Sequence, residues 1–380
     1  MRAALPHQLN NFDTLRLTAA LLVLVSHQHA LTGMREPSVL NAHSLGGLGV
    51  LIFFSISGFL VAQSWQTDPS VWRFTLKRLL RIWPALAVAV VLAALVLGPM
   101  VSSLPWREYY ASPLIPEYFK NLRFELRDQL PMRFEGSALP TAVNGSLWTI
   151  PLELKCYIAL AVLGLAGLLR QRWLMLALLL LVTATYDIAM NRGDGFAEFF
   201  NWRIEQRLLL EFGLFFFAGT MFQAFALHRS SLKVKSMLLG ACWVLAGLAL
   251  YMQRPLLALW LALPTTVLLF GNASTPFLRR SGRFGDLSYG MYIYAFPVQQ
   301  TLIWLYKDSL PWGVLLGLTV AVTSLLAFAS WHLVEKWALR FKPGKRPQKT
   351  MQIDANTNAN TNVNAEAEAE KISKSPTAIA

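Results

Sequence analysis

The chain has 380 residues, of which 55% are hydrophobic and only 14% are charged, and its formal net charge is +13. Soluble domains carry about 25% charged residues, so this composition excludes an ordinary soluble enzyme. In a membrane protein the positive charge follows from Lys and Arg in cytoplasmic loops, and we expect no nucleic-acid partner. The apolar runs are continuous rather than alternating, which argues against a β-barrel.

Apolar stretches long enough to cross a bilayer, about 20 residues each, recur along the whole chain. Lys and Arg gather in alternate short loops, and the positive-inside rule places those loops and both termini in the cytoplasm. The fold class is therefore predicted to be all-α: a polytopic helical membrane bundle with about ten transmembrane helices. The predicted spans are residues 12–33, 46–64, 79–98, 147–168, 172–190, 208–227, 236–252, 255–271, 287–305 and 311–333.

The first span contains Arg16 and His27, eleven residues apart. Eleven residues are about three helical turns or roughly 16 Å, so the two side chains share nearly one face. Ionisable residues are costly inside a bilayer, which makes both candidates for function. The alternative is a snorkelling arginine with a structural histidine. His29 points to a different face and is not expected to replace His27.

Small residues in Phe53–Leu60 of the second span favour close helix packing. At the cytoplasmic start of the third span, Arg78 and Arg81 are three residues apart and share a helix face. Arginine forks suit phosphate oxygens, so this pair is a candidate site for a soluble anionic ligand. Ordinary anchoring at lipid headgroups is the alternative.

A long outer segment follows at residues 99–146. A loop of that length is usually functional or disordered. Two interpretations stay open: the segment covers the outer mouth of a cavity, or it is a structured surface loop with no direct role.

The fourth span begins with Asn144–Glu153, and Glu153 lies about two turns into the membrane. A carboxylate there needs a partner, and a histidine is a natural one because the carboxylate can orient its ring. Pairing with Lys155 is the alternative, although residues two apart on a helix do not face each other. Near the end of the chain, a local contact between His332 and Glu335 is favoured.

Cys156 and Cys242 both fall in apolar spans, so we predict neither a disulfide nor a metal site. The segment after Pro343 is of low complexity and has few apolar residues to bury, which is typical of disorder. The sequence therefore predicts a membrane domain at residues 1–342 and a disordered cytoplasmic tail at 343–380.

Taken in order over about residues 10–342, these motifs resemble the acyltransferase-3 family of membrane proteins. Three features depart from the family pattern: Leu17 replaces a small glycine, the late Tyr-x-x-His lacks its histidine, and the closing motif, His332-x-x-Glu335, is one residue tighter. The matching motifs are Phe12-Asp13-Thr14-Leu15-Arg16 with His27, Phe53–Phe59, Arg78 with Arg81, Ser146-Leu147-Trp148 with Glu153, and Leu287–Tyr292.

The resemblance implies an O-acetyltransferase-like enzyme in the inner membrane of a bacterium. The acyl group, most often acetyl, would pass from cytoplasmic acyl-CoA to a hydroxyl of a cell-surface carbohydrate such as O-antigen, exopolysaccharide or a lipid-linked repeat unit. No permanently bound cofactor is implied, because acyl-CoA is a co-substrate, and membrane lipids surround the protein. We expect no fused extracytoplasmic hydrolase-like domain of the kind that some members carry. The protein would therefore finish the transfer alone or pass the acyl group to a separate periplasmic acyl-transfer or glycan-assembly protein.

The resemblance also implies roles for single residues. His27 would act as general base with Glu153 orienting it, or would itself carry the acyl group. The CoA phosphates would bind Arg78 and Arg81 with Arg16, and the substrate-binding residues would be Ser146, Trp148 and Tyr289. The competing class is a transporter or flippase of a glycan or lipid-linked intermediate, without covalent chemistry.

Overall fold

The structure, a computed structural model, describes residues 10–191, 204–306 and 309–344. The chain divides into a unit at residues 1–342 and a second unit at 343–380. The predicted disordered tail lies outside the described residues apart from its first two positions.

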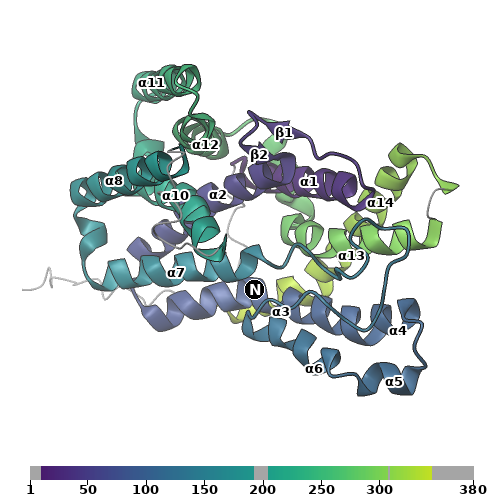
Figure 1. The fold of residues 1–380 in the computed structure, drawn as a ribbon. Helices are drawn as coiled ribbons and strands as arrows, with labels where there is room; N and C mark the ends of the chain where they lie inside the picture. The colour runs from purple at the N-terminus through teal and green to yellow at the C-terminus, as the bar shows by residue number, and fades with distance from the viewer. Residues whose placement is uncertain (1–9, 192–203, 307–308, 345–380) are drawn as a thin grey trace, which may run out of the picture. The chain divides into compact units, whose positions relative to one another are not determined.

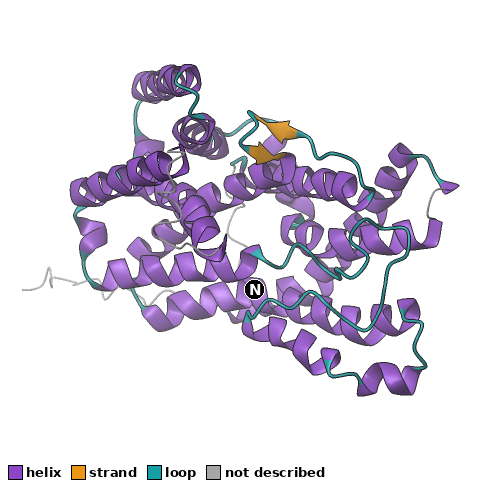
Figure 2. Cartoon of the chain, viewed as in Figure 1, coloured by secondary structure: helices purple, strands orange, loops and turns teal. Residues whose placement is uncertain are grey.

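Long helices make up most of the described chain, joined by short helices and loops (Figures 1 and 2). The long helices are α1 Phe12–Leu31, α2 Leu45–Thr67, α3 Val71–Leu92, α7 Thr149–Leu165, α8 Arg172–Asn191, α10 Ile204–Ala224, α11 Leu232–Tyr251, α12 Pro255–Asn272, α13 Ser288–Tyr306 and α14 Trp312–Ser330. The short ones are α4 Gly98–Val101, α5 Trp106–Ala111, α6 Leu114–Tyr118 and α15 Lys336–Ala338. The described strands, β1 Ser38–Val39 and β2 His43–Ser44, form an antiparallel hairpin.

Each predicted span coincides with one of these long helices, so the all-α class is confirmed with the small hairpin as an addition. In the described chain, 7 helices are long and apolar enough to cross a membrane. The long helices outside that set are α1, α7 and α13. These three contribute Arg16, His27, Glu153 and Tyr289. Polar residues lower the mean hydropathy of α1 and α13, whereas α7, with 17 residues, is short.

The third helix differs from its predicted bounds, because α3 begins at Val71 rather than at residue 79. Asp68 precedes it and accepts hydrogen bonds from Arg73 and Lys77. These bonds hold the pKa of the Asp68 carboxyl well below its usual range. With its first basic side chains paired in this way, the helix runs unbroken through Arg78 and Arg81.

Helix α2 lies at the centre of the unit, packed against α1 on one side and α10 on another. Two glycines permit the contact with α10. A Cβ on Gly58 would lie 1.8 Å from the carbonyl oxygen of Phe216, and one on Gly219 would lie 2.2 Å from that of Ser55. The two backbones therefore touch, as small residues allow in membrane helices.

The long outer segment packs onto neighbouring helices. Tyr109 is fully buried and donates to the carbonyl oxygen of Ala94 at 2.8 Å, and Figure 1 shows α5 and α6 beside α3 and α4. Gln300 on α13 donates to the carbonyl oxygens of Leu139 and Ala142. The segment is thus held both by the helical stretch that directly precedes it and by α13, which lies far from it in sequence.

Candidate active site

Two cavities lie along α1, one near each end. The first, here called the Arg78 cavity, has a volume of about 140 Å³. Apolar residues of α2 line it together with these polar side chains: Arg16, Ser57, Arg78, Arg81, Thr149, Glu153, Tyr157, Ser288, Tyr289 and Tyr292.

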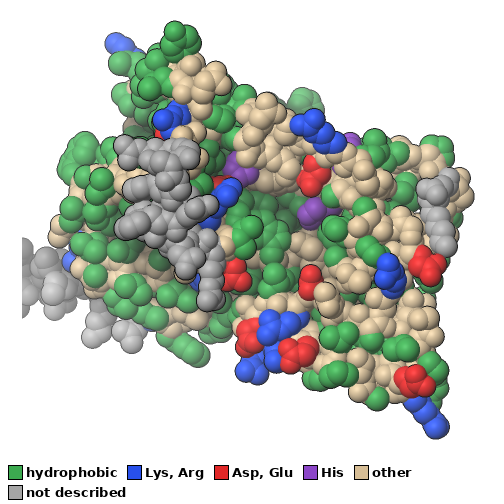
Figure 3. All heavy atoms as spheres, viewed as in Figure 1, with side chains coloured by type: hydrophobic (Ala, Val, Ile, Leu, Met, Phe, Trp, Pro, Cys, Tyr) green, Lys and Arg blue, Asp and Glu red, His purple; other side chains and the backbone are tan. Residues whose placement is uncertain are grey.

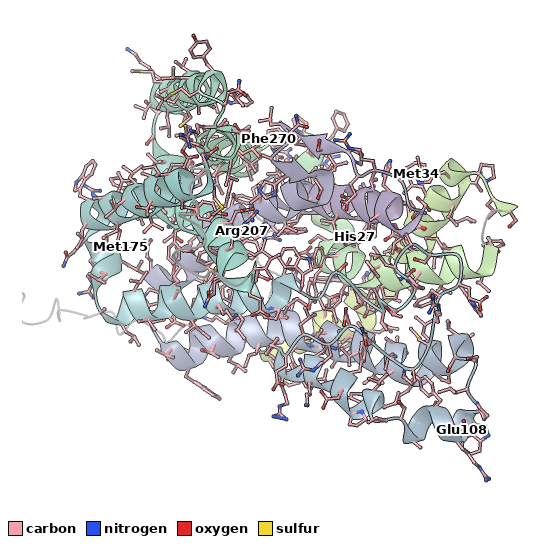
Figure 4. The ribbon with its side chains drawn as sticks, in the orientation of Figure 1. His27, Met34, Glu108, Met175, Arg207 and Phe270 are labelled. Carbon is pink, nitrogen blue, oxygen red and sulfur yellow. The ribbon has the colours of Figure 1, made fainter. Side chains whose placement is uncertain are left out.

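The second, here called the His27 cavity, has a volume of about 540 Å³. Figure 3 shows histidine and charged side chains around a hollow between α1 and α10, and the labelled His27 and Arg207 lie at its two sides in Figure 4. Val50 and Tyr292 line both cavities, so the two adjoin. Arg16 and His27, on one continuous helix, therefore reach different cavities.

Asp286, in the turn before α13, joins the arginines of the Arg78 cavity. Its Oδ2 accepts from Arg16 at 3.0 Å and from Arg81 at 2.6 Å. Burial alone would raise the pKa of the Asp286 carboxyl, but these two arginines and Ser288 outweigh it and hold the pKa well below its usual range. Arg81 also pairs with Glu335 at 3.0 Å. Two of the three predicted phosphate-binding arginines are therefore already paired with carboxylates.

Arg78 differs from those two arginines. Its guanidinium lies between the rings of Phe74 and Tyr157, 5.9 and 6.0 Å from the ring centroids. Its Nε is buried without a hydrogen-bond partner, and no ion pair of Arg78 is seen in the described part of the chain. Arg78 is therefore the cavity arginine that remains available to an anion.

Lys342 adds a further basic group near the Arg78 cavity, beside its three arginines. Part of its side chain reaches solvent, but protein atoms packed around the ammonium disfavour the charged form. The positive charges of Arg81, Arg78 and Arg16 add repulsion, and together these effects lower the pKa of Lys342 to about 8.

Glu153 faces the Arg78 cavity and not His27. Its Oε1 accepts from Ser57 at 2.9 Å and also from the hydroxyl of Tyr157. The alternative partner Lys155 is exposed and lines an apolar pocket between α7, α8 and α10. Across the described residues, no contact joins Glu153 to His27, and the two side chains line different cavities.

His27 is held edge-on against Phe296, with ring centroids 5.1 Å apart. Its Nδ1 is buried and has no hydrogen-bond partner among the described residues. The carboxylate that acts on it electrostatically is Glu36, which accepts a hydrogen bond from Ser26. As expected, His29 lies elsewhere: its Nδ1 donates to the carbonyl oxygen of Val25 at 2.9 Å.

The three predicted substrate-binding residues lie in different places. Trp148 lines the His27 cavity. Tyr289 lines the Arg78 cavity, stacks with Arg81 and donates to the carbonyl oxygen of Ile82 at 2.9 Å. Ser146 is fully buried with an unpartnered hydroxyl and lines neither cavity.

The closing motif also differs from expectation. The predicted contact between His332 and Glu335 is wrong. Glu335 instead pairs with Arg81 and accepts a hydrogen bond from Ser330. His332 instead contacts the carbonyl oxygen of Phe284 at 3.2 Å. Residues Trp331–Glu335 form a π-helical turn, which turns Glu335 toward α3. Such turns are common at functional sites.

Sequence reasoning missed a group of polar residues in the His27 cavity: His43, Tyr186 and Glu211. Glu211 is a carboxylate inside an apolar span, so the rule applied to Glu153 would have found it. The long outer segment 99–146, by contrast, contributes no described residue to the lining of this cavity. Both cysteines are free, as predicted.

The comparisons with known proteins agree with the motifs. Residues 9–331 match the family model described as an acyltransferase domain. The chain belongs to the acyltransferase-3 family. It is 34% identical to the O-acetyl transferase of Shigella phage Sf6 over 87% of this chain and 96% of the relative. It is 30% identical to Nodulation protein 10 of Rhizobium leguminosarum bv. viciae over 88% of this chain and 94% of the relative. No solved structure matches it significantly.

Membership of this family decides between the two function classes left open by the sequence. The protein is a multi-pass membrane acyltransferase of the O-acetyltransferase kind, and not a transporter without covalent chemistry. An acyl donor and a carbohydrate acceptor are implied by the same relationship.

Proposed function

We propose that this protein moves an acetyl group from cytoplasmic acetyl-CoA to a hydroxyl of a cell-surface or lipid-linked carbohydrate, such as an O-antigen or exopolysaccharide unit. The observation that carries the proposal is the pair of adjoining cavities: one contains Arg78 and the other His27, whose buried Nε and Nδ1 have no hydrogen-bond partner among the described residues. A soluble anionic donor and a membrane-side acceptor need two such openings.

On the donor side, the CoA phosphates bind first to Arg78 and Lys342. Neither side chain forms an ion pair with a carboxylate among the described residues. Arg16 and Arg81 contribute through the network around Asp286, which keeps both guanidinium groups in place. The cavity of about 140 Å³ is too small for a whole CoA, so the nucleotide stays outside and only the thin pantetheine arm enters.

The thioester then passes Val50 and Tyr292, which border both cavities. His27 removes the proton from the acceptor hydroxyl, and the hydroxyl oxygen attacks the thioester carbonyl carbon. The C–S bond breaks, the ester forms, and the CoA thiolate leaves with the proton from His27. Glu36 stabilises the imidazolium meanwhile. If His27 instead carries the acyl group, its imidazole nitrogen attacks the thioester carbonyl carbon and the CoA thiolate leaves. The acceptor hydroxyl then takes the acyl group from the imidazole.

Glu153 acts from the donor side in this proposal. Together with Ser57 and Tyr157 it forms a hydrogen-bonded group beside Arg78. That group would hydrogen-bond the pantetheine arm on its way to the border with the His27 cavity, while Tyr289 and Trp148 line the donor and acceptor sides.

For the setting of the enzyme, we propose that all ten long helices cross a bacterial inner membrane, with both termini and the Arg78 cavity on the cytoplasmic side. The acceptor then reaches the His27 cavity from the periplasmic side. Either this protein completes the transfer or a separate periplasmic protein receives the acyl group.

The test uses protein in lipid nanodiscs with labelled acetyl-CoA and lipid-linked saccharides. We expect label in the saccharide with wild type, and its loss by at least about 100-fold in His27→Ala, as for removal of a general base, with acetyl-CoA binding retained. Equal transfer by wild type and His27→Ala would show that the histidine is structural. No acetyl-CoA binding by wild type would contradict the donor side of the proposal.

A further inference from the structure

We infer that one wall of the His27 cavity, formed by His43, Tyr186 and Glu211, is the binding site for the acceptor, and that it selects a neutral sugar. The inference rests on the proposed function, because it names what the second substrate touches. We call these three residues the acceptor wall.

Three separate elements build the acceptor wall. His43 comes from strand β2, Tyr186 from α8 and Glu211 from α10. Oε1 of Glu211 lies 2.9 Å from Nε2 of His43, and its Oε2 accepts from the hydroxyl of Tyr186. Residues from three chain segments thus converge on one carboxylate whose side chain is 6% exposed.

The turn into α2 fixes the position of His43. Ser44 is the N-cap of α2, and its side chain accepts from the backbone N–H of Gly47 at 3.1 Å. A Cβ on Gly47 would lie 2.8 Å from Nδ1 of His43, so the glycine makes room for the ring. Nε2 of His43 is buried and lies 2.9 Å from Oε1 of Glu211. The carboxylate therefore holds the imidazole at the wall of the cavity that both residues line.

The chemistry of the acceptor wall suits a sugar. A carboxylate accepts from a hydroxyl, and an imidazole or phenol can donate or accept, so neighbouring hydroxyls of one ring can each find a partner. Trp148 and Phe212 also line this cavity, with ring centroids 5.5 Å apart. Aromatic faces offer an apolar surface to the C–H groups of a sugar. A volume of about 540 Å³ is in the range of small-ligand sites.

Charge selects against acidic acceptors. Arg207 is the cation among the described lining residues of the His27 cavity, whereas Glu36 and Glu211 are two carboxylates. The Arg78 cavity is lined by three arginines and one glutamate. A phosphorylated donor is therefore attracted to the Arg78 cavity, and a glycoside without negative charge meets less repulsion in the His27 cavity.

The experiment measures acetyl transfer in lipid nanodiscs to a panel of neutral alkyl glycosides, including dodecyl maltoside, and to dodecyl glucuronide as the acidic probe. We compare wild type with His43→Gln, Tyr186→Phe and Glu211→Gln. The control is His29→Gln, whose ring bonds to the carbonyl oxygen of Val25, outside both cavities. Acetyl-CoA binding is measured for every variant and also reports correct folding.

We expect the KM for neutral glycosides to rise at least tenfold in the three wall variants, with acetyl-CoA affinity unchanged and the His29→Gln control like wild type. Glu211→Gln should narrow the preference for neutral over acidic glycosides. If the acceptor KM is unchanged in all correctly folded wall variants, the inference fails and the proposed function stands. The same holds if wild type prefers the glucuronide. If wild type binds acetyl-CoA but transfers to no glycoside, the inference and the acceptor side of the proposed function both fail. Absence of acetyl-CoA binding contradicts the donor side.

Discussion

At the scale of residues, the decisive contrast is between paired and unpaired ionisable groups. Arg16 and Arg81 share the carboxylate of Asp286, whereas the guanidinium of Arg78 lies over aromatic rings and its buried Nε has no hydrogen-bond partner among the described residues. An unsatisfied buried donor costs free energy, and a ligand that satisfies it recovers that cost on binding.

Arg78→Gln should therefore weaken acetyl-CoA binding by about 10- to 100-fold, which corresponds to roughly 1.4 to 3 kcal/mol. Isothermal titration of purified protein measures the change. Arg73→Gln is the matched control, because Arg73 lies on the same helix but its guanidinium is taken by Asp68. Equal losses in both variants would mean that general positive charge, and not a specific contact, binds the donor.

At the scale of elements, close packing of α2 positions both cavities. α2 lines the Arg78 cavity along its middle and the His27 cavity at its start. Its contact with α10 depends on Gly58 and Gly219, where the backbones touch. Because Glu211 and Phe212 belong to α10, this crossing also places part of the His27 cavity.

Gly58→Ala should force α2 and α10 apart, since the new Cβ would lie 1.8 Å from a backbone oxygen that cannot move alone. Overpacking of this kind costs about 1 to 3 kcal/mol, so the thermal unfolding midpoint in detergent should fall. Gly240→Ala on α11 serves as the control, because its Cβ would meet no atom within 4 Å. An unfolding midpoint equal to that of wild type in Gly58→Ala would contradict this account of the crossing.

At the scale of the whole molecule, the protein joins two cavities of different charge through a border at Val50 and Tyr292. Desolvation of the Lys342 ammonium, with added repulsion from Arg81, Arg78 and Arg16 of α3 and α1, lowers the pKa of Lys342 to about 8. The ionisation of this one lysine therefore changes within an accessible pH range.

Donor binding should depend on pH for this reason. Below pH 8 Lys342 is protonated and attracts the CoA phosphates, and above its pKa that charge is lost. A bound anion favours the protonated form, so acetyl-CoA affinity should fall by about fivefold as the pH rises through and beyond 8, which is roughly 1 kcal/mol for a partly exposed charge pair. Lys342→Met should bind more weakly at pH 7 and lose most of this dependence. The same pH profile in wild type and Lys342→Met would assign it to another group.

Most of the helical fold, and the candidate residues on single helices, could be predicted from the amino-acid sequence. Long apolar runs can only be buried as helices in a bilayer, so the helix positions followed directly, apart from the early start of α3. The spacing of Arg16 and His27 was equally readable, because both lie on one continuous helix whose geometry is known.

Which ionisable groups meet could not be predicted from the sequence, because it depends on how distant helices pack. Arg81 and Glu335 are 254 residues apart, and local periodicity carries no information about such a pair. The same holds for the choice of Glu36 rather than Glu153 beside His27. His43 and Glu211 likewise meet only because a hairpin and a distant helix pack around the same cavity. A carboxylate in an apolar span indicates that a partner is needed, but the packing between helices determines which residue that partner is.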